Sequence, residues 1–211
     1  MIARMSRTLV IVDVQNDFCP GGSLATDRGS EVARDVAKLV RTQDYDFIVA
    51  TQDWHIDPKG HFSEDPDFVD TWPVHCVADT EGAAMHAALA DAPIDTFFHK
   101  GAYTAAYSGF EAECVDDGAI LAEWLREREV SELDIVGIAT DHCVRATAID
   151  ALREGFTVNV LESYCSPVSE ERAKKDLCRT ARGRGKGRLR RGGQKMPRRI
   201  SGAQRAGAAA P

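Results

Sequence analysis

The stretch "ELDIVGIATDHCVRATAIDALREG" (residues 132–155) joins a strand to a helix and thereby decides the kind of fold. Residues 132–139 form a near-continuous apolar run, which is typical of a strand buried on both faces of a parallel sheet. From residue 142 onward apolar residues recur at helical spacing, and Gly155 is a natural helix stop. A strand that leads directly into a helix predicts a crossover between parallel strands.

The same alternation of strands and helices runs through the rest of the chain. We expect further strands at 7–14, 46–51, 94–100 and 156–163, and helices at 30–42, 81–92 and 118–129. This pattern predicts an α/β fold: a Rossmann-like three-layer sandwich in which helices flank a parallel sheet through right-handed crossovers.

Length and composition describe an ordinary globular protein. The 211 residues are 44% apolar and 28% charged, which is enough for one domain with a sizeable core. No apolar run reaches the ~18 residues of a membrane span, and the N-terminus lacks the features of a signal peptide. The six cysteines form no CxxC pair, which indicates free thiols in a reducing compartment. We therefore expect a cytoplasmic protein that does not enter a membrane.

Charge is distributed very unevenly along the chain. All 33 acidic residues precede residue 179, whereas 11 of the 26 Lys and Arg lie at residue 179 or after it, and the formal net charge is −7. We expect residues 1–178 to form the globular domain. Residues 179–211, the basic tail, are almost wholly Arg, Gly, Ala, Lys and Pro. Such a composition cannot bury enough apolar surface to offset the entropy of ordering, so we expect the basic tail to be disordered.

Three reactive side chains follow strands of the predicted sheet. Asp13 closes the first apolar run, Lys100 ends the third, and Cys143 follows the fourth. The carboxyl ends of parallel strands share one edge of the sheet, where ligands bind. A carboxylate can take a thiol proton, an ammonium can stabilise a thiolate, and a helix N-terminus favours the thiolate as well. Each residue has a structural alternative when taken singly: a packed cysteine, a capping aspartate or a solvated lysine. The three residues together favour nucleophilic cysteine catalysis.

A second group of residues has the composition of a metal site. Asp53, His55 and His61 fall within nine residues, and His75 follows in "WPVHC". One carboxylate and three imidazoles suit zinc, iron or manganese, with room for water in a catalytic site. Histidines on the surface of a long polar loop are the alternative. The remaining three histidines, His86, His99 and His142, are interpreted as structural or supporting residues.

Five blocks of sequence, in order, resemble a known family. They are "IVDVQNDFCPGGSL" (11–24), "TQDWHIDPKGHFS" (51–63), "WPVHCV" (72–77), "FFHKGAYTAAYSGFE" (97–111) and "IVGIATDHCVRATA" (135–148). Together they resemble the bacterial nicotinamidases, also called pyrazinamidases, within the isochorismatase-like cysteine hydrolases. The resemblance covers roughly residues 7–172. The isochorismatase branch lacks the nucleophilic cysteine, so Cys143 argues against that branch.

The resemblance assigns roles to individual positions. It implies a catalytic triad of Asp13, Lys100 and Cys143, and metal ligands at Asp53, His55, His61 and His75. It also implies an oxyanion hole formed by the backbone amides of Ala139 and Cys143, with a cis bond between Ile138 and Ala139. The substrate pocket that it implies is lined by Phe18, Leu24, Trp72, Tyr107 and Ala139.

The function implied by the resemblance is hydrolysis of nicotinamide to nicotinate and ammonia, a step in NAD salvage, with one divalent metal ion as cofactor. Pyrazinamide is expected to be hydrolysed as well. Two alternatives remain open: a related C–N hydrolase of another small amide or carbamoyl compound, which is expected to lack the metal set, and a non-catalytic binding protein. The sequence does not indicate the oligomeric state.

The end of the chain departs from the family pattern. In the family a helix near "VSEERAKKDL" (168–177) continues and is followed by a last strand, and we expect both to be missing or disrupted here. Arg, Gly, Ala and Pro are what GC-rich codons encode out of frame, so a frameshift is the favoured interpretation. A basic arm that binds nucleic acid is the alternative. Loss of the last helix and strand predicts an exposed sheet edge and low stability.

Overall fold

The computed structural model describes residues 6–169, 171 and 189–191, and these form an α/β sandwich. The described strands make one sheet of seven, in the order β4-β3-β2-β1-β5-β6-β7. They are β1 (Ser6–Val12), β2 (Phe47–Asp53), β3 (Thr96–Lys100), β4 (Glu113–Cys114), β5 (Val130–Ile138), β6 (Thr157–Ser166) and β7 (Leu189–Arg191). The helices are α1 (Gly29–Thr42), α2 (Leu121–Glu127) and α3 (Cys143–Arg153), with 3₁₀ turns η1 (Asn16–Phe18), η2 (Ala87–Leu89) and η3 (Gly109–Glu111). All strand pairs are parallel except β3 with β4.

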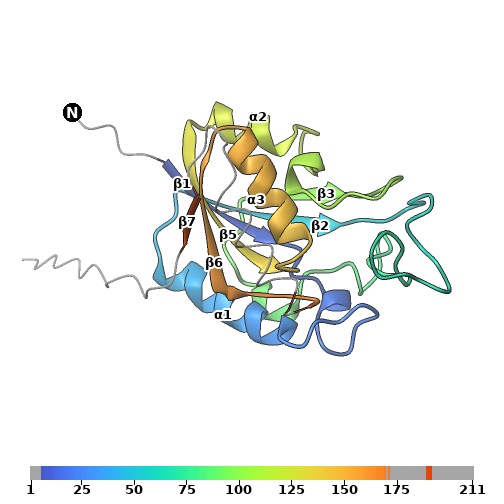
Figure 1. Ribbon diagram of the computed structural model, residues 1–211. Coiled ribbons are helices and arrows are strands. Elements are labelled where there is room, and N and C mark those ends of the chain that lie inside the picture. Colours follow the sequence, from blue (N-terminus) through green and yellow to red (C-terminus); the bar gives the residue numbers. More distant parts are fainter. Residues whose placement is uncertain (1–5, 170, 172–188, 192–211) are drawn as a thin grey trace, which may run out of the picture.

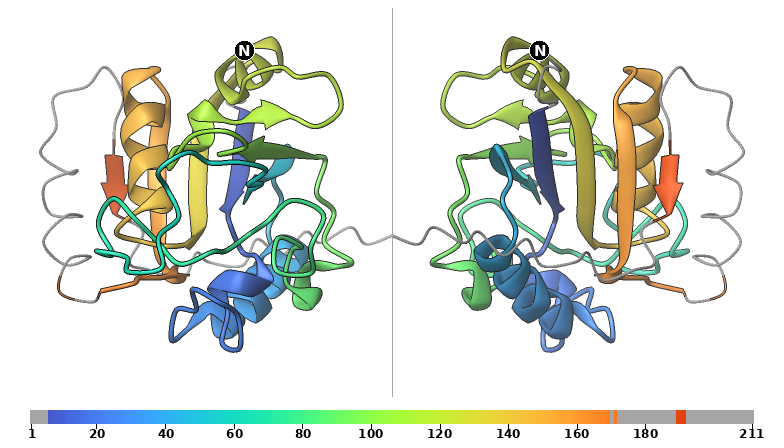
Figure 2. Two further views of the ribbon diagram at one scale, coloured as in Figure 1. Left: turned by 90° about the vertical axis from the view of Figure 1, so that its right-hand side faces the viewer. Right: turned by 90° about the vertical axis from the view of Figure 1, so that its left-hand side faces the viewer.

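Helices cover both faces of the sheet. Figures 1 and 2 show α1 on one face and α2 and α3 on the other. The central strand β1 serves both layers because successive side chains point to opposite faces. Leu9 and Ile11 pack with the apolar face of α1, whereas Val10 and Val12 belong to the core cluster that includes residues of α2 and α3. Each fully buried side chain of this kind contributes about 1.5–3 kcal/mol. The predicted three-layer sandwich is confirmed.

The order of the strands places a switch point between β1 and β5. After β1 the chain builds the sheet outward through β2, β3 and β4, and it then returns to the other side of β1 as β5. The connections that leave the carboxyl ends of β1 and β5 therefore diverge and leave a crevice between them. In doubly wound sheets, ligands bind at such a point. In Figure 1 the long loop after β2, coloured teal, extends from this same end of the sheet.

The helix predicted for 81–92 does not form. The backbone of this segment bonds to the chain after β1 instead: Asn16 N–H donates to Ala84 O at 3.0 Å, and His86 N–H donates to Val14 O at 2.9 Å. Only the 3₁₀ turn η2 is helical, and the His86 side chain caps it by accepting from Ala88 N–H. Tertiary hydrogen bonds therefore override the local helical periodicity.

Several other boundaries differ from the prediction. Strand β2 extends to Asp53, so this carboxylate belongs to the strand end rather than to the loop, and β6 runs on to Ser166. Helix α2 is shorter than the predicted 118–129, and the two-residue strand β4 was not expected. A strand ends where its hydrogen bonds to the neighbouring strand end. The periodicity of the sequence does not show that point, so the observed strand ends differ from the predicted ones by a few residues.

The end of the chain carries one described strand. Leu189–Arg191 pairs in parallel with β6, so a three-residue strand is present where we expected the last strand of the family to be missing or disrupted. The rest of the basic tail, and the segment 172–178 where a family helix would continue, lie outside the described residues. Within the described part, none of the helices is long and apolar enough to cross a membrane.

Candidate active site

Cys143 lies at the carboxyl end of β5, as the first residue of α3. Gly137 lets β5 come this close to β1: its φ is 120°, and a Cβ at this position would lie 2.0 Å from the carbonyl oxygen of Val12. The Ile138–Ala139 bond is cis, as the family resemblance implied. The chain then turns at 139–142 and enters α3, which buries the Cys143 side chain at the switch point.

The structure brings the three predicted catalytic side chains together. Lys100 Nζ lies 3.0 Å from Asp13 Oδ2 and 3.7 Å from Cys143 Sγ, and it donates to Ala106 O at 3.3 Å. Lys100 also forms an ion pair with Asp53. One oxygen of Asp13, one oxygen of Asp53 and the sulfur of Cys143 all lie within 4.8 Å of one another. The carboxylate, ammonium and thiol predicted from three strand ends therefore form one buried cluster.

Burial sets the protonation of this cluster. It raises the pKa of the Cys143 thiol well above its ordinary value, and the nearby Lys100 offsets only part of that effect. Burial also raises the pKa of Asp13, against the attraction of Lys100. For Lys100, burial disfavours the charge, yet Asp13 and Asp53 outweigh it and hold its pKa well above the usual range. The resting thiol is therefore protonated, in contrast to the thiolate expected from the helix N-terminus, and it needs a proton acceptor.

Thr51 holds Asp13 in place. The Thr51 hydroxyl donates to Asp13 Oδ1 at 2.7 Å, and the Asp13 N–H donates to the Thr51 carbonyl at 3.1 Å. Asp13 itself adopts a φ of 49°, in the left-handed region that L residues rarely occupy. The remaining oxygen of Asp13, Oδ2, faces Lys100. Sequence reasoning did not identify Thr51, because a threonine in a β-strand gives no signal of its own.

The predicted metal ligands also converge. His55, His61 and His75 each offer a ring nitrogen within 4.8 Å of the others, and all three are buried. Asp53 Oδ2 lies 3.9 Å from Nε2 of both His55 and His75. Asp53 therefore faces Lys100 with one oxygen and the histidine cluster with the other.

The orientation of the rings fits a metal ion. Nδ1 of His55 donates to Gly101 O, and Nδ1 of His75 donates to Pro73 O, each at 2.7 Å. A carbonyl only accepts, so each Nδ1 carries the proton and each Nε2 lone pair faces the cluster. Within the described residues, His55 Nε2 and His61 Nδ1 are buried without a hydrogen-bond partner. Unpaired buried nitrogens of this kind are costly unless something binds them.

The charge state of the rings agrees with this assignment. Burial, with the neighbouring rings of His55 and His75, lowers the pKa of His61 to about 4. Burial lowers the pKa of His75 as well, although Asp53 opposes the change. Neutral imidazole is the form that coordinates a metal ion. The donor set of one carboxylate and three imidazoles therefore fits zinc, iron or manganese.

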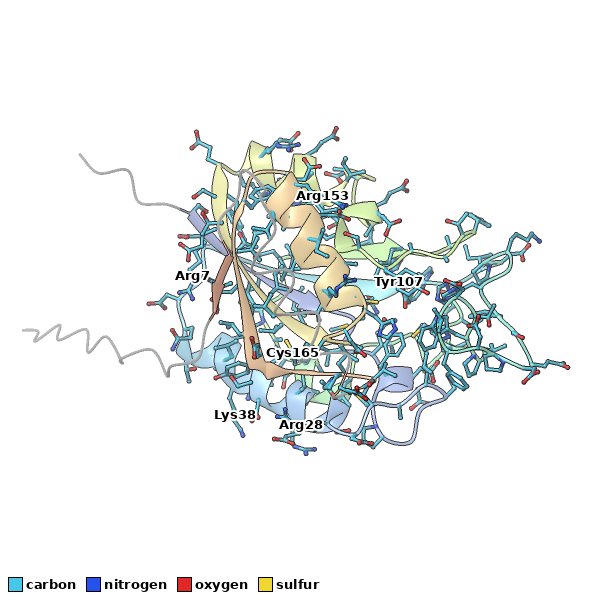
Figure 3. All side chains as sticks on the ribbon, in the orientation of Figure 1. Arg7, Arg28, Lys38, Tyr107, Arg153 and Cys165 are labelled. Atoms are coloured by element: carbon cyan, nitrogen blue, oxygen red, sulfur yellow. The ribbon has the colours of Figure 1, made fainter. Side chains whose placement is uncertain are left out.

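A pocket borders the thiol of Cys143. Its lining includes every residue predicted for the substrate pocket, namely Phe18, Leu24, Trp72, Tyr107 and Ala139, and also Cys143, Asp53, His61 and His75. Trp72 Nε1 donates to the Tyr107 hydroxyl at 2.9 Å, which fixes these two rings relative to each other. Figure 3 shows Tyr107 at the end of the molecule that bears the loop after β2, and Arg7 at the opposite end. Aromatic rings and the reactive groups therefore line the same pocket.

His142, interpreted from the sequence as a structural or supporting residue, also lines this pocket. Its ring lies 5.1 Å from the Trp72 ring, and its Nδ1 lies 3.3 Å from Asp141 Oδ1. The other two histidines do support the structure: His86 caps η2, and His99 stacks on Trp54 with ring centroids 4.1 Å apart.

The fold and the cluster define a class of protein: an amidohydrolase of the α/β fold class, with a thiol, a carboxylate and an ammonium at the switch point of a mostly parallel sheet. The chain belongs to the isochorismatase family, because the model of the isochorismatase domain matches residues 7–186. This match extends beyond the limit of 172 expected from the motifs and ends inside the basic tail.

Relatives of known activity and structure agree with this assignment. The nicotinamidase/pyrazinamidase of Mycobacterium tuberculosis is 53% identical over 167 residues, covering 78% of this chain and 89% of the relative. A crystal structure of PnC1 from L. infantum in complex with nicotinate matches with a TM-score of 0.74 at 29% identity, over 89% of this chain and 96% of that chain. The pyrazinamidase of Pyrococcus horikoshii in complex with zinc matches with a TM-score of 0.71 at 33% identity, over 88% and 99%.

Proposed function

We propose that this chain is a metal-dependent nicotinamidase, which hydrolyses nicotinamide to nicotinate and ammonia and acts on pyrazinamide as well. The observation that carries the proposal is the Cys143 thiol packed against Lys100 and Asp13 at the side of an aromatic pocket that also contains the Asp53 and histidine cluster. The similar proteins from M. tuberculosis and L. infantum support the choice of substrate. Such a reaction returns nicotinamide to NAD synthesis. The five described cysteines are all free thiols, which suits the reducing cytoplasm.

The first chemical step joins the thiol to the amide carbon. Asp13 takes the proton of Cys143 while the sulfur attacks the carbonyl carbon of the substrate. The Asp13 carboxyl suits this task because its raised pKa makes it a stronger base than an exposed aspartate. Lys100 stabilises the negative charge on sulfur from 3.7 Å. Proton transfer therefore accompanies attack, because the resting thiol is protonated.

The carbonyl oxygen becomes negatively charged in this step and needs donors. We assign that role to the backbone N–H groups of Ala139 and Cys143. Cys143 is the first residue of α3, so its N–H has no partner inside the helix and points out of the N-terminus. Each such donor contributes about 3–4 kcal/mol in other hydrolases.

The second half of the reaction regenerates the enzyme. Protonated Asp13 gives its proton to the departing nitrogen, the C–N bond breaks, and ammonia leaves a thioester on Cys143. Asp13 then removes a proton from water, the hydroxide adds to the thioester carbon, and the C–S bond breaks to release nicotinate. The proton from Asp13 returns to the sulfur.

The pocket and the metal set orient the substrate. Phe18, Trp72 and Tyr107 present aromatic faces to a flat ring, and Leu24 adds an apolar contact. Asp53, His55, His61 and His75 would hold one divalent ion. When bound, such an ion supplies a Lewis acid that can orient the ring nitrogen of the substrate. A related hydrolase of another small amide is expected to lack this donor set, which favours nicotinamide.

A direct assay tests the proposal. Purified protein is incubated with nicotinamide, and ammonia and nicotinate are measured before chelation, after chelation and after return of zinc, iron or manganese. We expect both products in equal amounts, loss of turnover after chelation and recovery with metal. Turnover of other small amides without any turnover of nicotinamide would overturn the proposal.

A further inference from the structure

Gln15 is completely buried, and its side chain pairs with the backbone of Asp53. Its Oε1 accepts from the Asp53 N–H at 2.9 Å, and its Nε2 donates to the Asp53 carbonyl at 2.8 Å. One amide group therefore meets both polar groups of a single residue. In a parallel sheet, backbone groups of the neighbouring strand make such bonds.

The course of β1 explains why a side chain is needed here. Strands β1 and β2 pair up to Val12 and Thr51, and Asp13 N–H still donates to Thr51 O. The φ of 49° at Asp13 then turns the chain away, while β2 continues to Asp53. The N–H and C=O of Asp53 would be left buried without partners, at a cost of about 1–3 kcal/mol each. The Gln15 amide supplies the missing partners and extends the ladder by one residue.

A third contact fixes the Gln15 side chain itself. Nε2 also donates to Ala83 O at 2.8 Å, and the backbone of Gln15 forms a bridge with Met85. Gln52, next to Asp53, donates to the same Ala83 carbonyl at 2.9 Å but makes no bond to Asp53. The side chains of Gln15 and Gln52 thus both donate a hydrogen bond to Ala83 O, and of the two only the Gln15 side chain also forms hydrogen bonds with the backbone of Asp53.

The carboxylate of Asp53 has to serve two partners at once. One oxygen pairs with Lys100, and the other lies 3.9 Å from Nε2 of both His55 and His75. A carboxylate shared in this way depends on the placement of its own backbone. We propose that Gln15 is a positioning residue, which fixes the Asp53 backbone so that its carboxylate stands between Lys100 and the histidine cluster before any metal binds. This inference rests on the proposed function only in taking Asp53 as a metal ligand.

Zn²⁺ affinity tests the proposal independently of turnover. Gln15→Met keeps the length of the side chain and removes its hydrogen bonds, and Gln52→Met is the matched control that removes only a bond to Ala83. The dissociation constant is measured by competition with a chromophoric chelator, and folding is checked by circular dichroism. We expect Gln15→Met to bind Zn²⁺ about 10- to 100-fold more weakly, as for other residues that orient metal ligands, and Gln52→Met to bind it as the wild type does. Equal affinities in both variants, whether unchanged or reduced, would overturn the proposal.

Hydrogen exchange in the metal-free wild-type protein gives a second test, which holds even if Gln15→Met fails to fold. We expect the Asp53 amide to be as protected as the amide of Val49 within the β2 ladder. Rapid exchange at Asp53 beside a protected Val49 would refute a fixed pairing. Neither measurement uses nicotinamide, so a protein that fails to hydrolyse it can still support the role of Gln15. Conversely, a protein that does hydrolyse nicotinamide would still disprove the role of Gln15 if the two variants bound Zn²⁺ equally or if the Asp53 amide exchanged rapidly.

Discussion

The ammonium of Lys100 lies 3.0 Å from Oδ2 of Asp13, and both side chains are buried. The same ammonium pairs with Asp53 and lies 3.7 Å from the sulfur of Cys143. One cation therefore compensates two buried carboxylates, of which one belongs to the thiol chemistry and the other to the metal set. Removing one partner from such a cluster leaves an uncompensated buried charge, so its members are coupled in stability as well as in function.

Substitution of the nucleophile is the first prediction. Cys143→Ala removes the sulfur that attacks the amide, so nicotinamide turnover should fall by about 10³-fold or more while the fold persists. The control is Cys114→Ala, which removes another buried thiol, on β4 and outside the pocket, and should retain activity. Turnover is followed by ammonia release, and folding by circular dichroism. Substantial hydrolysis by Cys143→Ala would exclude the thioester mechanism.

Substitution of the base should separate thiol reactivity from turnover. Asp13→Asn has nearly the same shape but cannot take the thiol proton, so turnover should fall almost as far as in Cys143→Ala. The Asp13 charge also raises the pKa of Cys143, whereas Lys100 lowers it, so the variant should have a lower thiol pKa. Alkylation of Cys143 by iodoacetamide near neutral pH should then become faster. Turnover by Asp13→Asn close to that of the wild type would exclude Asp13 as the proton acceptor.

The histidine cluster predicts a metal content of one ion per chain. His55→Ala or His75→Ala removes a nitrogen that faces the cluster, so bound metal should fall toward zero and activity should fall with it. The thiol of Cys143 should stay reactive, because both variants keep Lys100, whose Nζ lies 3.7 Å from the sulfur. His86→Ala, which alters only the cap of η2, serves as the control and should retain its metal. Elemental analysis that finds no metal in active wild-type protein would contradict the assignment.

The close approach of the paired strands β1 and β5 predicts a steric penalty at one glycine. Gly137→Ala places a Cβ 2.0 Å from the Val12 carbonyl oxygen, so the strands must separate, and we expect the unfolding free energy to drop by at least about 2–3 kcal/mol. Gly155→Ala is the matched control, because Gly155 also has a positive φ, 95°, yet a Cβ there meets no atom within 4 Å. Denaturant unfolding measures both variants. Equal losses would show that φ, rather than the contact with Val12, limits Gly137.

The ionisation of the buried Asp141 carboxyl group should make the stability of the fold depend on pH. Burial opposes its charge, but His142 and the N–H group of Val168 outweigh burial and hold the pKa of Asp141 below its ordinary value. The pKa of Asp141 is therefore lower in the folded chain than in the unfolded chain, where it is about 3.9. The Asp141 charge stabilises the folded state fully above the unfolded pKa, and this stabilisation is lost as pH falls through the folded pKa.

The corresponding variant is Asp141→Asn. It should lose about 1–3 kcal/mol of unfolding free energy at pH 7, and its difference from the wild type should shrink as pH falls below about 4. Asp150→Asn, at an ion pair with Arg153 on the surface of α3, changes the net charge equally and serves as the control. A difference between wild type and Asp141→Asn that stays constant from pH 7 to pH 3 would refute the role of the Asp141 charge.

Much of the candidate site could be predicted from the sequence. Apolar runs identified β1, β2, β3 and β5, and reactive side chains stood where each run ended. Parallel strands bring their carboxyl ends to one edge, so strand identity alone implied that Asp13, Lys100 and Cys143 would meet. In the structure these three side chains lie together, and the pocket residues drawn from the family motifs line one cavity.

What the sequence by itself determined is therefore the alternation of elements and the chemistry carried at each strand end, because burial patterns and residue types are local properties. The tertiary structure alone decided that 81–92 bonds to the chain after β1 instead of forming a helix, and that Thr51 and Gln15 hold Asp13 and Asp53. It also decided that burial keeps the Cys143 thiol protonated. These features depend on hydrogen bonds and burial between segments far apart in the chain, and neither periodicity nor spacing reports such pairings.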